Sequence, residues 1–247
     1  YFGDDRLAKG DRRYEHVTID DSSVRPEADI EYLTDTMTDD AVDFIRRHAD
    51  RPSFLVVAYT APHGPMHARP EDLDAIDGRL QGKRRTYAAM MRALDRGVGR
   101  IADAIDETGR DTMLIFVNDN GGATNNASDN GPWRGMKGSL FEGGIRVPAF
   151  LRRTETTPPG SIDHPTTSLD LVATAIAATG ADGAGLDGID LSPWIGASSP
   201  APDRSICWRR GPVAAIRDGG MKLIRVEEAG SMLFDVDADP GETTNLA

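Results

Sequence analysis

The spacing of apolar residues predicts two amphipathic helices in the first half of the chain. Apolar side chains recur at three- and four-residue steps from residue 30 to about His48, and again from Tyr87 to Ile105. Gly109 follows the second run, where a glycine commonly ends a helix. The first 30 residues are polar and charged without a sustained period. We therefore expect irregular structure there.

Continuous apolar runs predict strands that are covered on both faces. S-F-L-V-V-A-Y-T, residues 53–60, precedes the long helix, and T-M-L-I-F-V, residues 112–117, follows it. Strand, helix and strand in this order predict a β-α-β crossover with parallel strands and a right-handed connection. R-V-P-A-F-L-R, residues 146–152, predicts another short strand. These elements indicate an α/β body.

The last third of the chain changes character. Residues 168–179 are rich in alanine and predict a helix that Ser168 caps and Gly180 closes. A Ser/Pro/Ala segment, residues 196–203, is typical of a linker, and four short apolar runs separated by turn residues follow it. The sequence thus predicts an α/β domain over residues 1–198 and a small antiparallel β subdomain over residues 199–247.

Composition narrows the classes of function. The 247 residues are 39% hydrophobic, enough for a substantial core, and 40 acidic residues against 28 basic ones give a net charge of −12. Long-range attraction to nucleic acid or an anionic membrane is therefore disfavoured. No apolar run approaches the length of a membrane span, and the first residues lack the apolar run of a signal peptide. The only cysteine, Cys207, allows no intrachain disulfide and is interpreted as a packing residue in a strand.

Polar residues follow both apolar runs of the α/β body, where loops at the carboxyl ends of parallel strands hold ligand sites. Asp119 and Asn120, in N-D-N-G-G, offer a carboxylate and an amide oxygen, which are hard ligands suited to Ca2+ or Mg2+. The same residue types favour tight turns. Taken alone, D-N-G-G favours the turn.

Two histidines and a lysine are further candidates. His63 and His67 are four residues apart, but Pro62 and Pro65 make a helix there implausible, so the spacing does not predict a metal pair. Lys137 lies in W-R-G-M-K-G-S-L, where flanking glycines allow a close approach to an anion, although a solvated loop lysine is more common.

The acidic stretch D-V-D-A-D-P-G-E near the C-terminus is interpreted as a turn. It resembles the start of a calcium-binding loop, but Pro240 occupies the position that needs glycine. Leu246 falls where the bidentate glutamate of such a loop belongs.

Four motifs, in order, resemble the second half of the type I sulfatases of the arylsulfatase kind. They are A-Y-T-A-P-H-G-P, I-F-V-N-D-N-G-G, W-R-G-M-K-G-S-L-F-E-G-G-I-R-V-P and L-F-D-V-D-A-D-P-G-E-T-T-N-L-A. The resemblance extends from about Tyr32 to the last residue. It implies the alkaline-phosphatase-like α/β fold, with a partial parallel-sheet core followed by a small C-terminal antiparallel sheet.

The resemblance also implies hydrolysis of a sulfate ester of an aryl or sugar substrate. It assigns Asp119 and Asn120 as Ca2+ ligands, and His63 and Lys137 as catalytic residues that contact the sulfate. A fixed cation and cationic donors suit a transition state that spreads negative charge over oxygens. Zinc phosphatases of the superfamily place histidine after the aspartate, so Asn120 favours an oxygen-only calcium site.

The family's nucleophile is a formylglycine made from a C/S-x-P-x-R motif, which does not occur in this sequence; Cys207 precedes W-R-R and does not fill the role. We expect the nucleophile and two further Ca2+-binding aspartates in an N-terminal half that is missing here, and expect the 247-residue piece alone to be inactive.

Two alternatives stay open. One is a phosphonate or phosphate ester hydrolase of the same superfamily that uses zinc or manganese. The other is a non-catalytic relative that binds sulfated glycans. The sequence leaves the identity of the ester and the oligomeric state undetermined. Localisation is also open, although a signal peptide in the missing half would favour a periplasmic or secreted protein.

Overall fold

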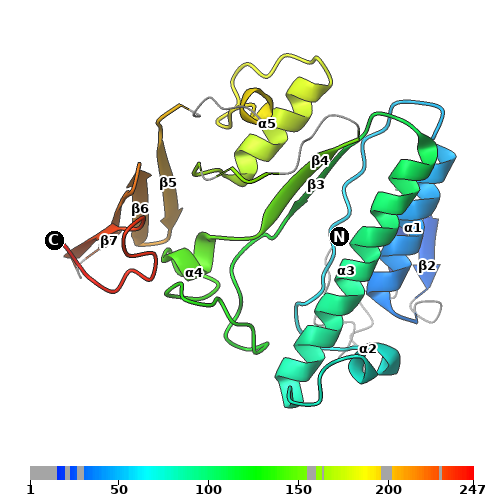
Figure 1. Ribbon diagram of the computed structural model, residues 1–247, viewed down its shortest axis with the longest axis horizontal. Coiled ribbons are helices and arrows are strands. Elements are labelled where there is room, and N and C mark those ends of the chain that lie inside the picture. Colours follow the sequence, from blue (N-terminus) through cyan, green and yellow to red (C-terminus); the bar gives the residue numbers. More distant parts are fainter. Residues whose placement is uncertain are drawn as a thin grey trace. The chain divides into compact units, whose positions relative to one another are not determined.

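The structure is a computed structural model (Figure 1). It describes the backbone of residues 16–19 and 23–26, and residues 31–154, 160–162, 164–195, 202–227 and 230–247 in full. The chain forms two compact units. The first comprises residues 1–110 and 124–128, and the second comprises residues 111–123 and 129–247.

Two long helices form the body of the first unit. α1 (Leu33–Arg47) and α3 (Gly82–Thr108) lie side by side (Figure 1). Both predicted helices are confirmed, and Gly109 ends α3 in the left-handed conformation at φ 63°. The apolar stripes face each other and bury Ala41, Val42, Ala93, Leu94 and Ile101. A short helix, α2 (Pro70–Asp74), precedes α3.

A glycine lets α1 and α3 approach closely. A Cβ atom at Gly97 would lie 2.6 Å from Oγ1 of Thr38. That hydroxyl is fully buried and donates to the Thr34 carbonyl at 2.8 Å, and it shares a 2.7 Å hydrogen bond with the hydroxyl of Tyr59. A side chain at position 97 would therefore displace a satisfied buried polar group.

The expectation for the first 30 residues was wrong in part. β1 (His16–Ile19) pairs antiparallel with β2 (Ser23–Pro26). Alternation over four residues is too short to distinguish such strands from polar loops, and their pairing depends on the partner as much as on the residues themselves.

The strand predicted at residues 53–60 does not form. Residues 51–60, all of which the structure describes, belong to no strand and pair with no other described segment. Phe54 is 79% exposed and Val56 is 70% exposed. Every strand among the described residues pairs antiparallel, so the predicted parallel crossover is not formed. An apolar run predicts that a segment is buried, but it does not identify the neighbouring strand to which the segment would hydrogen-bond.

The second unit contains the remaining predicted elements of the α/β domain. β3 (Met113–Val117) and β4 (Ala149–Arg153) are confirmed, and they pair antiparallel with Phe116 opposite Phe150. α5 (Ser168–Ala178) is also confirmed, but its cap is Thr167 rather than Ser168. The carboxylate of Asp170 accepts the backbone N–H of Thr167 at 2.7 Å, which completes a capping box that the sequence pattern did not single out.

The predicted C-terminal sheet is confirmed. β5 (Ser205–Arg210), β6 (Val213–Asp218), β7 (Met221–Val226) and β8 (Gly230–Asp235) pair antiparallel in sequence order. Its inner face packs against Leu140, three residues after Lys137, in a hydrophobic core that also contains Ala215, Ile224, Phe234 and Val236. A short helix, α4 (Glu142–Ile145), and a 3-10 turn, η4 (Ser192–Trp194), precede the sheet. Residues 196–201 of the predicted linker, with the predicted domain boundary, lie outside the described residues.

Asp170 links the start of α5 to the segment before β5. Burial favours its neutral form, but hydrogen bonds from Arg204 and from the backbone N–H groups of Thr167 and Ile189 outweigh burial and hold the pKa of the carboxyl below its usual value. A carboxylate whose folded-state pKa is lowered stabilises the fold above the unfolded pKa of about 3.9, and this contribution is lost as the pH falls below it.

Asp170→Asn should therefore destabilise the protein by about 2 kcal/mol at pH 7, the scale of charge-assisted hydrogen bonds, and by less near pH 3. Urea unfolding at the two pH values measures this difference. Asp182→Asn, which changes an exposed carboxylate that accepts only a local N–H from Ala184 at 2.9 Å, is the matched control. An equal loss for Asp170→Asn at both pH values would contradict the assignment.

Candidate functional site

Asp119 and Asn120 follow directly after β3. The backbone N–H of Asn118 donates to the Pro148 carbonyl at 3.2 Å, which extends the pairing of β3 and β4 up to the two residues. Asp119 is exposed and Asn120 is half-buried. The side-chain amide of Asn120 donates from Nδ2 to the carbonyl of Gly121 at 2.9 Å. This bond orients the amide and leaves Oδ1 as its acceptor.

Backbone hydrogen bonds tie this segment to the loop that carries Lys137. The N–H of Gly121 donates to the Gly144 carbonyl at 3.0 Å, and the N–H of Lys137 donates to the Gly122 carbonyl at 2.8 Å. The N–H of Gly122 donates to the side chain of Asn130 at 2.8 Å. The structure thus brings Asp119, Asn120 and Lys137 into one bonded loop system within the second unit.

Gly121 has no room for a side chain. A Cβ there would lie 1.9 Å from the carbonyl oxygen of Gly143 and 3.1 Å from the Cα of Gly144. Both neighbours are backbone atoms, so relief requires the two segments to separate.

Gly121→Ala should lower the free energy of unfolding by about 1–3 kcal/mol, as overpacking does. Gly78→Ala is the control, because nothing lies within 4 Å of a Cβ at that loop position. Thermal unfolding compares the two variants. Equal melting temperatures would show that the loops are not held at the contact seen here.

Lys137 is exposed on a backbone shaped by glycine. Gly135 and Gly138 have φ values of 87° and 90°, a region that side chains rarely adopt. Arg210, at the end of β5, donates from Nη1 to the carbonyl of Gly138 at 2.7 Å. The C-terminal sheet therefore contacts the residue next to Lys137.

His63 lies in the first unit, in a loop that contains no helix, as its prolines predicted. It is exposed, and its Nδ1 lies 2.7 Å from the carbonyl oxygen of Gly64. A carbonyl only accepts, so this contact requires Nδ1 to be the donor. The buried amide of Asn126 supports this loop by donating to the Pro62 carbonyl at 3.3 Å. His67 packs edge-on against the ring of Tyr32.

The C-terminal acidic stretch is a turn, as predicted. The carboxylate of Asp239 accepts the backbone N–H groups of Thr243 and Thr244, each at 2.8 Å, and these bonds lower its pKa. Asp235 accepts the N–H groups of Asp237 and Ala238. No three His, Cys, Asp or Glu side chains of the described residues converge as a metal site.

The predicted packing role of Cys207 is wrong. It lies in β5 as expected, but it is exposed, because the alternation of the strand places Ile206 in the core instead. A packing role was therefore the wrong interpretation.

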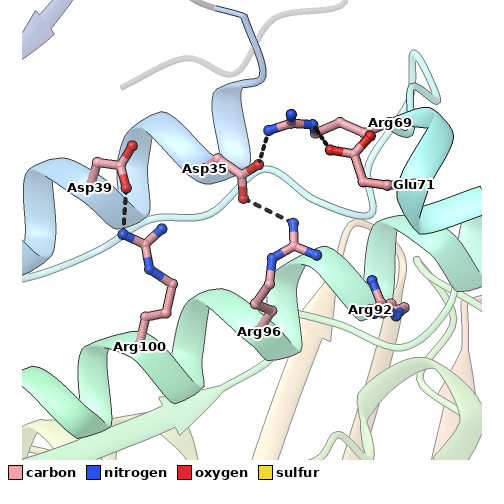
Figure 2. Close-up of a pocket in the computed structure, with 7 residues that line it drawn as sticks. All are labelled: Asp35, Asp39, Arg69, Glu71, Arg92, Arg96 and Arg100. Carbon is pink, nitrogen blue, oxygen red and sulfur yellow. Dashed lines mark hydrogen bonds and ion pairs between the residues drawn. The ribbon is translucent and has the colours of Figure 1, made fainter. Parts of the chain in front are cut away.

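The first unit contains a cavity of about 510 Å³ that none of the predicted site residues lines (Figure 2). Its arginines are paired: Arg96 binds Asp35 at 3.1 Å, and Arg100 binds Asp39 at 2.6 Å. The remaining lining residues are Arg69, Glu71 and Arg92. Arginines that already face carboxylates on α1 and α2 hold helices together, and they offer little to an added anion.

Sequence reasoning gave no role to a buried ionic cluster in the second unit. Nζ of Lys222 lies 2.8 Å from Oε1 of Glu142 and 2.9 Å from Oε1 of Glu242. Lys222 and Glu242 are fully buried, and Glu142 is 3% exposed. One signal was available. The alternation of β7 places Lys222 on the same inward face as Ile224, where an apolar residue is expected.

A model of the family described as Sulfatase matches residues 7–181. The chain belongs to the sulfatase family. Mouse steryl-sulfatase is 34% identical to it over 178 residues, which cover 66% of this chain and 27% of that protein. This sulfatase-family chain therefore spans about a quarter of that relative's length.

Comparison with solved structures identifies the fold. The crystal structure of Ps i-CgsB in complex with k-i-k-neocarrahexaose superposes with a TM-score of 0.82 at 33% identity, covering 90% of this chain and 52% of that one. A protein of the alkaline phosphatase superfamily from Vibrio parahaemolyticus gives a TM-score of 0.65 at 15% identity, over 87% of this chain and 49% of its own. The expected α/β fold class is confirmed. Among the described residues of this sulfatase-family chain, no helix is long and apolar enough to cross a membrane.

Proposed function

We propose that the complete protein hydrolyses a sulfate ester of a sugar or aryl substrate. Membership of the sulfatase family supports this proposal. One observation supports the assignment of this activity to particular residues: the N–H of Lys137 donates a 2.8 Å hydrogen bond to the carbonyl of Gly122, two residues after Asn120. A cationic side chain and two hard oxygen ligands thus belong to one loop system, as charge stabilisation of a sulfate requires.

Asp119 and Asn120 are proposed as ligands of a Ca2+ ion. Calcium takes about six to eight oxygens, and a carboxylate with an oriented amide oxygen fits such a site as part of its shell. The hydrogen bond from Asn120 Nδ2 to Gly121 supports the fit, because it holds the amide with its oxygen available. When bound, the ion would supply positive charge to the sulfate oxygens. Two further aspartates are proposed to belong to a preceding part of the complete protein.

Lys137 and His63 are proposed to contact the sulfate group. An exposed lysine acts as a point charge toward the nonbridging oxygens, where negative charge develops in the transition state. His63 would contribute its imidazole ring as a hydrogen-bond donor to the sulfate oxygens. The nucleophile is proposed to be a formylglycine in the preceding part of the complete protein, and so the 247 residues alone should be inactive.

A sugar is the substrate class with the most direct support. The structure of Ps i-CgsB, which is 33% identical to this chain, was determined with k-i-k-neocarrahexaose bound. We therefore propose a sulfated sugar as the first substrate to test, with an aryl sulfate as the general probe.

The experiment uses the complete protein, an aryl sulfate and a matched aryl phosphate, with Ca2+, Zn2+ or Mn2+ added after chelation. The expected result is sulfate release that depends on Ca2+. Faster phosphate release with Zn2+ or Mn2+ would replace the proposal by a phosphoesterase. Binding of a sulfated sugar without turnover, with no formylglycine detected by mass spectrometry, would replace it by a non-catalytic binding protein.

A further inference from the structure

The buried ionic cluster of Glu142, Lys222 and Glu242 joins two distant parts of the sequence. Glu142 opens α4, directly after the loop that carries Lys137, whereas Glu242 lies in the last turn of the chain. Besides their shared ion pairs with Lys222, the two glutamates are linked because Oε2 of Glu242 accepts the backbone N–H of Glu142 at 2.6 Å. Arg134 also donates to the carbonyl of Glu242 at 3.0 Å.

The excess negative charge of the cluster faces two neighbouring arginines. Two glutamates face one lysine, but Arg146 and Arg217 approach Oε2 of Glu142 at 3.7 Å and 3.9 Å. A buried cluster of this kind adds little net stability over apolar packing, but its geometry is demanding, because each charge needs its partner at one place. The cluster therefore fixes the relative positions of the segments that carry its residues more than it adds to the free energy of unfolding.

The cluster connects to the proposed site through backbone bonds alone. Gly143 and Gly144 follow Glu142 in α4, and the carbonyl of Gly144 accepts the N–H of Gly121 at 3.0 Å. Gly121 follows Asn120 directly, and Gly122 accepts the N–H of Lys137 at 2.8 Å. A displacement of Glu142 would thus be transmitted within two residues to the metal-ligand segment and to the backbone of Lys137.

We propose that Glu142, Lys222 and Glu242 are positioning residues, which set the Asp119–Asn120 segment and the Lys137 loop against the C-terminal sheet. The inference rests on the proposed function, because it concerns how that site is held. It makes the C-terminal sheet a part of the catalytic apparatus although no predicted catalytic residue lies in it. Neutralising Glu242 leaves Lys222 with one buried carboxylate partner, and shortening its side chain withdraws the acceptor from the N–H of Glu142.

Glu242→Gln in the complete protein tests the proposal, with Glu242→Asp as a second variant that keeps the charge but shortens its reach. The control is Arg153→Gln, which removes an exposed ion pair with Asp111 in the same unit. Measurements are kcat and KM for an aryl sulfate, the Kd of Ca2+ by calorimetry, and amide hydrogen exchange of residues 118–122 and 133–144.

In both Glu242 variants, kcat should fall and the Kd of Ca2+ should rise by about 10–100-fold, the range seen for partners that orient ligands. Hydrogen exchange should accelerate in the two loops while α5 stays protected. The control should change none of these. If Glu242→Gln does not fold, Glu242→Asp decides the outcome by the same readouts.

A lower melting temperature with unchanged kcat, Kd and loop exchange would overturn the inference, because the cluster would then be merely structural. Failure of the proposed function is distinguishable: the unmodified protein would neither bind Ca2+ nor release sulfate, whereas the loop exchange in the variants still reports whether the cluster holds these segments.

Discussion

Lys137→Ala should lower kcat for sulfate ester hydrolysis by the complete protein about 10²–10³-fold, as removal of one donor to a developing oxyanion does. The side chain is exposed, while the backbone is fixed by the hydrogen bond to Gly122 and by glycines on either side. The substitution therefore removes a charge from the site without disturbing the loop. Steady-state kinetics with an aryl sulfate measures the effect.

Two controls accompany this variant. Lys83→Ala removes another exposed lysine, whose Nζ donates to the Asn125 carbonyl at 3.3 Å, and it should leave kcat unchanged. Lys137→Arg retains the charge and should recover part of the activity, although its planar guanidinium presents donors differently. The free energy of unfolding of Lys137→Ala should match that of the unmodified protein within the small range typical of surface substitutions, about 0.5 kcal/mol. An unchanged kcat would remove Lys137 from the proposed site.

The sequence predicted well those elements whose specifying residues lie close together along the chain. α3 was predicted from its apolar period and from Gly109, and the residues that specify a helix and its end lie within a few positions of one another. The C-terminal sheet was predictable for the same reason, since each strand of β5 to β8 pairs with its sequence neighbour through a short turn.

Residues 53–60 show what the local sequence does not specify, namely the partner of a strand. Their apolar run matches a buried strand, yet Phe54 and Val56 are mostly exposed and the segment pairs with no other segment that the structure describes. Strand formation depends on hydrogen bonds to another segment, and neither the period nor the propensity of a run identifies that segment. The pairing of β3 with β4 was missed for the same reason: both strands were predicted, but their antiparallel partnership was not.

The candidate site was predictable to a similar extent. Motifs identified Asp119, Asn120 and Lys137, and the structure joins their loops. Glu142 and Glu242 also lie in the sulfatase-like motifs, but the motifs do not indicate that the two residues meet. Their contact depends on Lys222, which lies in a third segment. Their burial follows from tertiary packing, which a single sequence reveals only through one lysine at an inward strand position.

The second large effect is expected for Asp119→Ala, which should weaken Ca2+ binding by more than the 10–100-fold that loss of an outer partner costs. Asp119 supplies the only carboxylate of the N-D-N-G-G segment, and charge dominates the affinity of calcium sites. In the unmodified protein, Ca2+ at about 100 times its Kd should add about 2.7 kcal/mol of stability. Most of that increment should disappear in the variant.

Melting temperatures with and without Ca2+ measure the increment, and calorimetry gives the Kd directly. Asp182→Ala is the matched control, because this exposed carboxylate accepts a hydrogen bond from its own turn and should leave the increment intact. Asp119→Asn separates charge from shape: it keeps an oxygen at the same place, so an affinity between those of the unmodified protein and Asp119→Ala is expected. Equal calcium stabilisation of Asp119→Ala and the unmodified protein would place the ion elsewhere and leave D-N-G-G as a turn.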